Sequence, residues 1–175
     1  MDNMQVASLE VYTRSVTETH AFGNALGATI IALQIDALVM ALRGNLGAGK
    51  TALTQGLAAG LGVTDRVTSP TFVFVNEYAL PTGQTLIHID SYRLGDAPDA
   101  AALESFTFGL DEILAREDAI VVIEWAERLQ ELLPADHLQI ELTYSDDEPA
   151  HRTIHCRAHG PMSGRLLAAM PALYR

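Results

Sequence analysis

Lysine is almost absent from this chain: ten of its eleven basic residues are arginine, and Lys50 is the only lysine among 175 residues. Acidic residues number 22, so the formal net charge is -11 at pH 7. Proteins that bind nucleic acid directly usually carry a basic patch, whereas the positive residues here are scattered along the chain. The composition therefore argues against direct binding of nucleic acid, DNA included.

Cysteine and long apolar runs are equally scarce. Cys156 is the single cysteine, which excludes an internal disulfide and fits a reducing compartment. The first residues show no cationic segment followed by an apolar stretch, so no secretory signal is expected. The most apolar window, Ala25 to Leu42, is interrupted by Gln34 and Asp36, and a membrane span needs about 20 predominantly apolar residues. We therefore expect a cytoplasmic chain without membrane contact.

The length and the apolar pattern predict one domain over residues 1–175. Continuous apolar runs at Ala37–Leu42 and Ala119–Ile123 are typical of strands buried on both faces. Alternating segments predict further strands at Val6–Thr13, Phe72–Tyr78, Thr85–Asp90, His137–Tyr144 and Arg152–Ala158. Helices are predicted from Ser15 or Thr17 to about Leu33, from Lys50 to about Leu61, over Pro98–Leu114 with a break near Gly109, and after Pro161. Strands alternate with helices early and pair as hairpins later, so the pattern indicates a three-layer α/β fold with a mixed, partly antiparallel sheet.

A glycine-rich motif stands between the first apolar strand and the next helix. Residues 44–51 read GNLGAGKT, which fits G-x-x-x-x-G-K-[ST], the P-loop pattern. In such a loop the backbone amides and the helix N-terminus favour phosphate oxygens, the lysine reaches the terminal phosphates, and the threonine hydroxyl binds magnesium. We therefore predict binding of ATP with Mg²⁺, rather than a structural turn. The predicted nucleotide ligands are Gly44, Leu46, Gly47, Ala48, Gly49, Lys50 and Thr51.

Magnesium also needs carboxylate or water oxygens, and two acidic residues end predicted strands. Glu124 follows the apolar run that ends at Ile123, as in the second nucleotide-binding motif of P-loop enzymes. Asp90 ends the strand that begins at Thr85. We favour Glu124, with Thr51, as the metal ligand, and assign Asp90 to a metal-bound or attacking water. A solvated or capping role for either acid is the alternative.

Two other segments allow two readings each. The loop at Thr68–Thr71 could sense the terminal phosphate through a hydroxyl, with Thr71 in a catalytic role, or it could be an ordinary turn fixed by its proline. Three histidines spaced by four, His151, His155 and His159, would chelate a metal on a helix. The segment alternates as a strand, which favours histidines on a solvated face and separates His155 from Cys156.

The order and spacing of four motifs resemble the TsaE (YjeE) family of tRNA threonylcarbamoyladenosine biosynthesis ATPases. These motifs are GNLGAGKT, SPTF with a following NEY, HIDSYRL and IEWAE, beginning at residues 44, 69, 88 and 123. The resemblance runs from about Ser15 to Arg157. It implies a P-loop ATPase that acts on a complex of TsaD and TsaB, which transfers a threonylcarbamoyl group to adenosine 37 of tRNA. ATP hydrolysis would reset that complex between turnovers.

By these motifs, the resemblance implies that Lys50 binds phosphate and that Thr51 and Glu124 bind magnesium. Asp90 matches the acid of H-x-D-x-Y-R, and Thr71 matches the threonine of S-P-T. The sequence departs from the family at two loop positions, where Asn45 replaces a frequent aspartate and Ala52 a frequent threonine. Loss of that threonine removes a possible side-chain bond to the α-phosphate.

Three other functions are compared with this prediction. A small-molecule kinase would close an arginine-bearing lid over the phosphates, and the stretch between Asp90 and Glu124 offers only Arg93 and Arg116. A GTPase would need an Asn-Lys-x-Asp motif, and the single lysine excludes one. The third alternative is a module that binds ATP with little hydrolysis.

Overall fold

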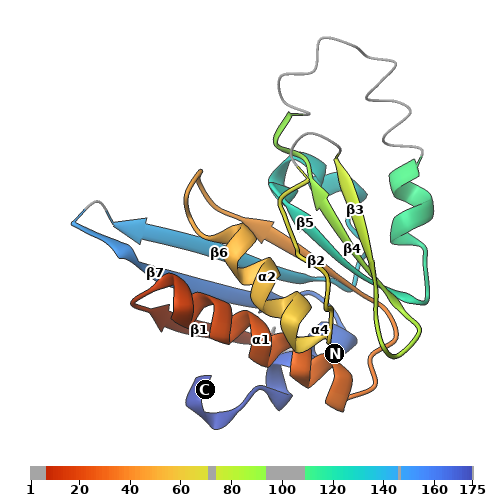
Figure 1. Cartoon of the computed structure of the whole chain (residues 1–175), viewed down its shortest axis with the longest axis horizontal. Helices are drawn as coiled ribbons and strands as arrows, with labels where there is room; N and C mark the ends of the chain where they lie inside the picture. Colours follow the sequence, from red (N-terminus) through yellow and green to blue (C-terminus); the bar gives the residue numbers. More distant parts are fainter. Residues whose placement is uncertain (1–6, 71–73, 94–108, 146, 175) are drawn as a thin grey trace, which may run out of the picture.

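A seven-stranded mixed sheet forms the centre of the computed structural model, which describes residues 7–70, 74–93, 109–145 and 147–174. The strand order is β1-β7-β6-β2-β5-β4-β3 (Figure 1). The strands are β1 (Ser8–Thr13), β2 (Leu38–Arg43), β3 (Val75–Ala79), β4 (Thr85–Asp90), β5 (Ala119–Glu124), β6 (Leu138–Ser145) and β7 (Glu148–Ala158). The four central strands β6, β2, β5 and β4 are parallel. At one edge β7 pairs antiparallel with β6 and β1 antiparallel with β7, and at the other edge β3 pairs antiparallel with β4.

Helices cover both faces of this sheet. Helices α1 (Val16–Ala32) and α2 (Lys50–Gly60) lie side by side on one face (Figure 1), and α4 (Pro161–Ala169) joins the same core. Residues 109–114 are helical and pack with η2 (Ala126–Leu132) against the other face, and η3 (Ala172–Tyr174) follows α4. Strand β2 contributes Met40 to the first core and Val39 to the second, so the sheet lies between two apolar layers. The predicted three-layer α/β fold with a mixed sheet is confirmed.

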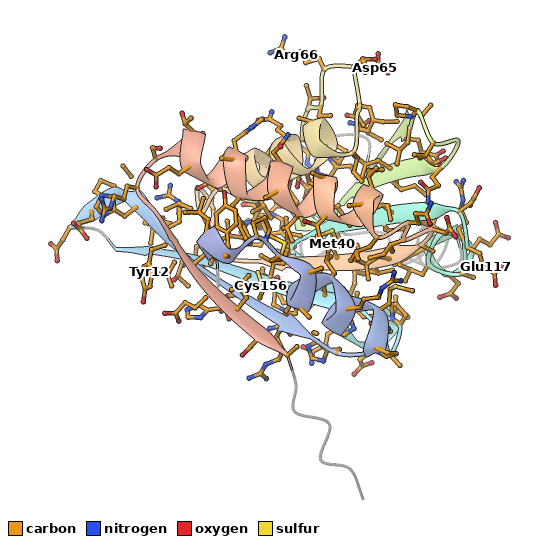
Figure 2. All side chains as sticks on the ribbon, turned by 90° about the horizontal axis from the view of Figure 1, so that it is seen from below. Tyr12, Met40, Asp65, Arg66, Glu117 and Cys156 are labelled. Atoms are coloured by element: carbon orange, nitrogen blue, oxygen red, sulfur yellow. The ribbon has the colours of Figure 1, made fainter. Side chains whose placement is uncertain are left out.

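The side chains follow the same layering. Figure 2 shows Met40 and Cys156 in the interior, whereas Asp65, Arg66 and Glu117 lie at the surface. Among the helices in the described ranges, none has the length and apolar character that a membrane span requires.

Most predicted element boundaries agree with the structure, and two strands differ. Ser15 caps α1 by accepting a hydrogen bond from the Glu18 amide, as predicted from its side-chain oxygen. Strand β3 begins at Val75, later than predicted, because Phe74 has a φ of 66° and leaves the extended region. Strand β7 begins at Glu148 rather than Arg152, since the hairpin with β6 continues almost to its turn.

Two further expectations are tested only in part. The predicted helix at Pro98–Leu114 is described only over residues 109–114, where Gly109 is itself helical. Residues 71–73, which include Thr71 and the start of the predicted strand at Phe72, lie outside the described residues.

Glycines bring the backbones of α1 and α2 into direct contact. A Cβ atom placed on Gly23 or Gly27 of α1 would lie less than 3.0 Å from backbone atoms of α2 or of Leu61, which follows it. The same holds for Gly56 and Gly60 of α2 against α1. Small residues spaced by four let helix backbones approach closely. Because α2 begins within the glycine-rich loop, this contact fixes the helix on which the loop depends.

We predict that Gly56→Ala lowers the free energy of unfolding by about 2 kcal/mol, the usual size of overpacking in a closed contact. The added Cβ would meet the backbone of His20, and the gain in helix propensity, at most about 1 kcal/mol, does not offset this. Chemical denaturation measures the effect. Gly164→Ala in α4 is the matched control, because a Cβ there meets nothing within 4 Å, and it should stabilise slightly. Equal effects of the two substitutions would contradict the close contact.

Candidate nucleotide-binding site

The glycine-rich loop connects β2 to α2 through backbone conformations that favour glycine. Gly44, Gly47 and Gly49 have φ values of 137°, 78° and 101°, a region that other residues rarely adopt. Gly49 is the N-cap of α2 and offers no side-chain cap to the first turn of the helix. The first amides of α2 are thereby left for a ligand, and a helix N-terminus with such amides favours anionic oxygens.

A cavity of about 310 Å³ lies on this loop, at the lower end of the size range of ligand pockets. Residues 46–52, from the loop and the first turn of α2, line it together with Ser69, Asp90, Tyr92, Glu124 and Trp125. Apart from Gly44, which begins the loop outside the cavity lining, and Thr71, which is not described, the cavity brings together all the predicted site residues.

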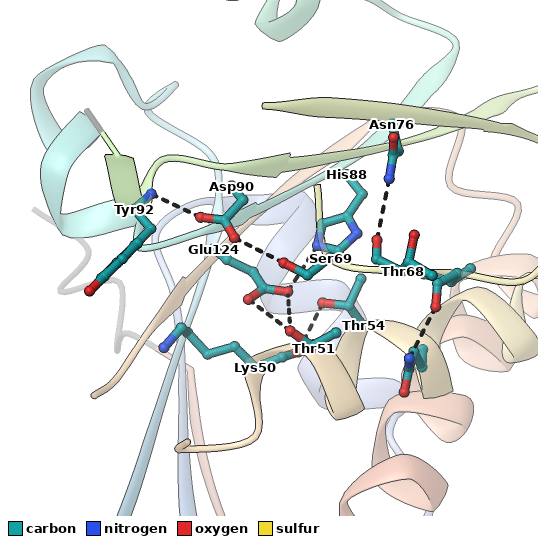
Figure 3. A network of polar contacts seen from close by, with 12 residues as sticks. Lys50, Thr51, Thr54, Thr68, Ser69, Asn76, His88, Asp90, Tyr92 and Glu124 are labelled. Atoms are coloured by element: carbon teal, nitrogen blue, oxygen red, sulfur yellow. Dashed lines mark hydrogen bonds and ion pairs between the residues drawn. The ribbon is translucent and has the colours of Figure 1, made fainter. Parts of the chain in front are cut away.

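Glu124 lies at the end of β5 and is buried next to the loop. Both of its carboxylate oxygens are 3.1 Å from the Thr51 hydroxyl, and Oε1 is 2.9 Å from Nε2 of His88 (Figure 3). The two predicted magnesium ligands are therefore in contact. Magnesium uses one or two carboxylates, waters and substrate phosphates, so a hydroxyl and a carboxylate beside a phosphate loop fit this ion.

His88 is a site residue that the sequence analysis missed. The imidazole is fully buried, and its Nδ1 has no hydrogen-bond partner in the described part of the chain. Because an ionised carboxylate only accepts hydrogen bonds, Nε2 is the ring nitrogen that donates to Glu124. Its position two residues before Asp90 on β4 is the signal that could have indicated it, because alternate residues of a strand share a face.

Asp90 ends β4 directly beside Glu124, since these two residues are paired in the parallel register of β4 and β5. Its Oδ2 accepts a hydrogen bond of 3.0 Å from the Ser69 hydroxyl, and its Oδ1 one of 2.8 Å from the amide of Tyr92 (Figure 3). Ser69 thus links the Thr68–Thr71 segment to the predicted catalytic acid. Both acids lie at one edge of the sheet because the carboxyl ends of parallel strands meet there.

Lys50 extends over the cavity beside an aromatic ring. Its Nζ donates to the carbonyls of Gly44 and Asn45 at 2.6 and 3.0 Å, and lies 3.8 Å from the centre of the Trp125 ring. Burial lowers the pKa of Lys50, while the nearby carboxylates of Glu124, Glu127 and Asp90 oppose this shift. An incoming phosphate would give the ammonium a stronger acceptor than a carbonyl.

Trp125 itself has a left-handed backbone with a φ of 60°, which disfavours a bulky residue. Its carbonyl accepts hydrogen bonds from the Ser91 hydroxyl at 2.8 Å and from the Arg128 amide at 3.1 Å. Its ring packs on that of Tyr92, with 4.9 Å between the ring centres. Strained residues of this kind cluster at functional sites.

The histidines of the last strand lie away from this site. His155 is exposed, and its Nδ1 lies 2.9 Å from a carboxylate oxygen of Glu10. Cys156 is buried, and burial raises the pKa of its thiol to about 12. No group of three His, Cys, Asp or Glu residues that could hold a metal occurs among the described residues. The strand interpretation is confirmed: His155 and Cys156 lie on opposite faces.

A buried parallel strand, a glycine loop, a helix and a carboxylate on the neighbouring strand define the P-loop class of nucleotide-binding folds. The family model described as threonylcarbamoyl adenosine biosynthesis protein TsaE matches residues 13–154. The chain belongs to the TsaE family, and so to the proteins of tRNA threonylcarbamoyladenosine biosynthesis.

Individual relatives agree with this assignment. The chain is 39% identical to the TsaE protein of Streptomyces coelicolor over 129 residues, which cover 73% of this chain and 82% of the relative. It is 42% identical to that of Bacillus subtilis over 113 residues, or 63% of this chain and 64% of the relative. The crystal structure of YdiB from Bacillus subtilis matches with a TM-score of 0.75 at 31% identity, and covers 96% of this chain and 97% of YdiB.

The position of Lys50 over the only tryptophan predicts a spectroscopic signal. Saturation with ATP and Mg²⁺ should change the emission of Trp125, because phosphate draws the ammonium away from the indole face. Lys50→Ala should lower ATP affinity by about 10- to 100-fold, the range for loss of a charged hydrogen bond. Calorimetry measures the affinity of both proteins. Saturated binding without any change in Trp125 emission would contradict this geometry.

Proposed function

We propose that this chain is a magnesium-dependent ATPase that supports transfer of a threonylcarbamoyl group to adenosine 37 of tRNA. In this proposal it acts on a complex of TsaD and TsaB, and ATP hydrolysis resets that complex between turnovers. The observation that carries the ATPase assignment is the contact of the Thr51 hydroxyl with both oxygens of buried Glu124, beside Lys50 in the loop. Membership of the TsaE family supports the place in tRNA modification.

Each residue of the site has a role in this proposal. The loop amides and Lys50 bind the phosphates, and Thr51 and Glu124 hold Mg²⁺, directly or through water. Bound Mg²⁺ would neutralise charge on the transferred phosphoryl group. Asp90 orients the attacking water, since the Ser69 hydroxyl and the Tyr92 amide fix its carboxylate at the cavity. Thr71 would sense the terminal phosphate.

The net negative charge of the chain disfavours direct binding to tRNA. Affinity for a polyanion rises with the number of phosphates that lysine and arginine neutralise. In this chain of net charge -11 the ten arginines are scattered along the sequence and the single lysine lies in the nucleotide site. Screening over about 8 Å at physiological salt weakens repulsion but creates no attraction. The chain therefore acts through protein partners, and a basic face of TsaD or TsaB suits its acidic surface.

Isosteric substitutions separate the roles of the two acids. Glu124→Gln should raise the magnesium concentration for half-maximal hydrolysis by about tenfold or more, as for other losses at metal sites. Asp90→Asn should lower kcat by about 100-fold, the usual contribution of a group that activates the nucleophile, with a smaller change in magnesium dependence. Magnesium titrations of ATP hydrolysis by the two variants test the assignment. A larger magnesium shift in Asp90→Asn would reverse it.

Reconstitution tests the function itself. With TsaD, TsaB, tRNA and an activated threonylcarbamoyl donor, we expect one round of modification without this chain and many rounds with it and ATP. Lys50→Ala should return the system to a single round. Repeated turnover at the parent rate with Lys50→Ala would contradict the proposal. Phosphate transfer to a metabolite instead of water would favour the small-molecule kinase.

A further inference from the structure

The hairpin of β6 and β7 holds the outer side of the phosphate loop. Arg152 of β7 donates from Nε to the carbonyl of Ala48 at 2.8 Å and from a terminal nitrogen to the carbonyl of Gly47 at 2.9 Å. The hydroxyl of Tyr144 on β6 donates to the carbonyl of Leu46 at 3.2 Å. Three consecutive loop carbonyls therefore accept hydrogen bonds from residues about 100 positions later in the chain.

The remaining contacts of Arg152 keep its guanidinium in place. Its other terminal nitrogen donates to the carbonyls of Pro149 and His151 at 2.5 and 2.8 Å, and the guanidinium carbon lies 5.0 Å from the centre of the Tyr144 ring. The hydrogen bonds described for Arg152 thus go to four carbonyls. A planar guanidinium with five donors suits such a set, whereas a lysine ammonium offers three donors from one point.

Hydrogen bonds to these carbonyls act on the inner side of the loop through the peptide groups. A carbonyl and the amide of the next residue form one rigid plane, so the bonds to Leu46, Gly47 and Ala48 orient the amides of Gly47, Ala48 and Gly49. A charged donor on the carbonyl also polarises the amide and makes it a stronger donor. Arg152 thus acts on the amides of Ala48 and Gly49, and Tyr144 on that of Gly47. The amide of Ala48 donates to the carbonyl of Asn45 at 3.1 Å, so Gly49 is the amide that gains most from Arg152 as a donor to phosphate.

The loop needs such support because glycine constrains its own backbone least. Its conformation has to be held from outside if the amides are to converge before a ligand arrives. We propose that Arg152 is a positioning residue for the phosphate loop, assisted by Tyr144, and that it raises ATP affinity without touching the nucleotide. This inference rests on the proposed ATP binding.

Arg152→Met and Arg152→Lys test this role, with Arg157→Met as the matched control. Arg157 is exposed and lies on the opposite face of the same strand, beside Glu141 and His155. The readouts are the Kd for ATP with Mg²⁺ from Trp125 emission at 25 °C, the KM and kcat of hydrolysis, and the thermal midpoint. Arg152→Met should raise Kd and KM about tenfold, equivalent to one charge-assisted hydrogen bond, with kcat at saturating ATP within about twofold. Arg152→Lys should raise both by about threefold, and Arg157→Met should change neither.

Tyr144→Phe provides a second variant if Arg152→Met does not fold. It removes the bond to the Leu46 carbonyl and keeps the ring beside the guanidinium, so Kd should rise about two- to threefold with an unchanged thermal midpoint. Failure of the parent protein to bind ATP would contradict the proposed function. Parent-like Kd in folded Arg152→Met, or in both Arg152→Lys and Tyr144→Phe, would overturn the positioning role alone. A lower thermal midpoint with a parent-like Kd in Arg152→Met would show that Arg152 contributes only to stability. That result would also overturn the positioning role.

Discussion

The structure depends on one constraint: the backbone of a short glycine-rich loop has to be held in a single conformation, with the carbonyls of Leu46, Gly47 and Ala48 bound from outside. Glycine permits the positive φ angles at Gly44, Gly47 and Gly49, but it also leaves the loop free to adopt others. The geometry therefore comes from the surroundings. Strand β2 fixes the beginning of the loop, helix α2 fixes its end, and the β6–β7 hairpin binds the carbonyls between them.

The rest of the fold places charge around this loop. Contact between the glycines of α1 and α2 holds the helix N-terminus in position, and the parallel register of β4 and β5 aligns Asp90 with Glu124. His88 and the Thr51 hydroxyl orient the Glu124 carboxylate. Lys50 supplies the cation among three acids and is held by its own loop and by Trp125. A polyanion with a divalent cation would complement this arrangement.

The sequence predicted the parts of the site that lie in local patterns. The loop motif has fixed spacing, and Glu124 and Asp90 each follow an apolar run, so a parallel sheet was sufficient to bring them together. Arg152 could not be assigned in this way, because its contacts join β7 to the loop across about 100 residues. His88 begins the HIDSYRL motif but received no role, because its contact with the Glu124 carboxylate joins two strands that are 36 residues apart in the sequence. The sequence does carry a signal for the close approach of α1 and α2, namely pairs of glycines spaced by four. Hydrophobic periodicity alone does not reveal it.

A crystal structure with a non-hydrolysable ATP analogue and Mg²⁺ tests the central claim most directly. The account predicts phosphate oxygens within hydrogen-bond distance of the amides of Gly47 and Gly49. It also predicts that Nζ of Lys50 leaves the carbonyl of Gly44 for the terminal phosphates, while Arg152 still binds the outer carbonyls. A nucleotide bound elsewhere, or Lys50 retained on its loop beside bound phosphates, would contradict it.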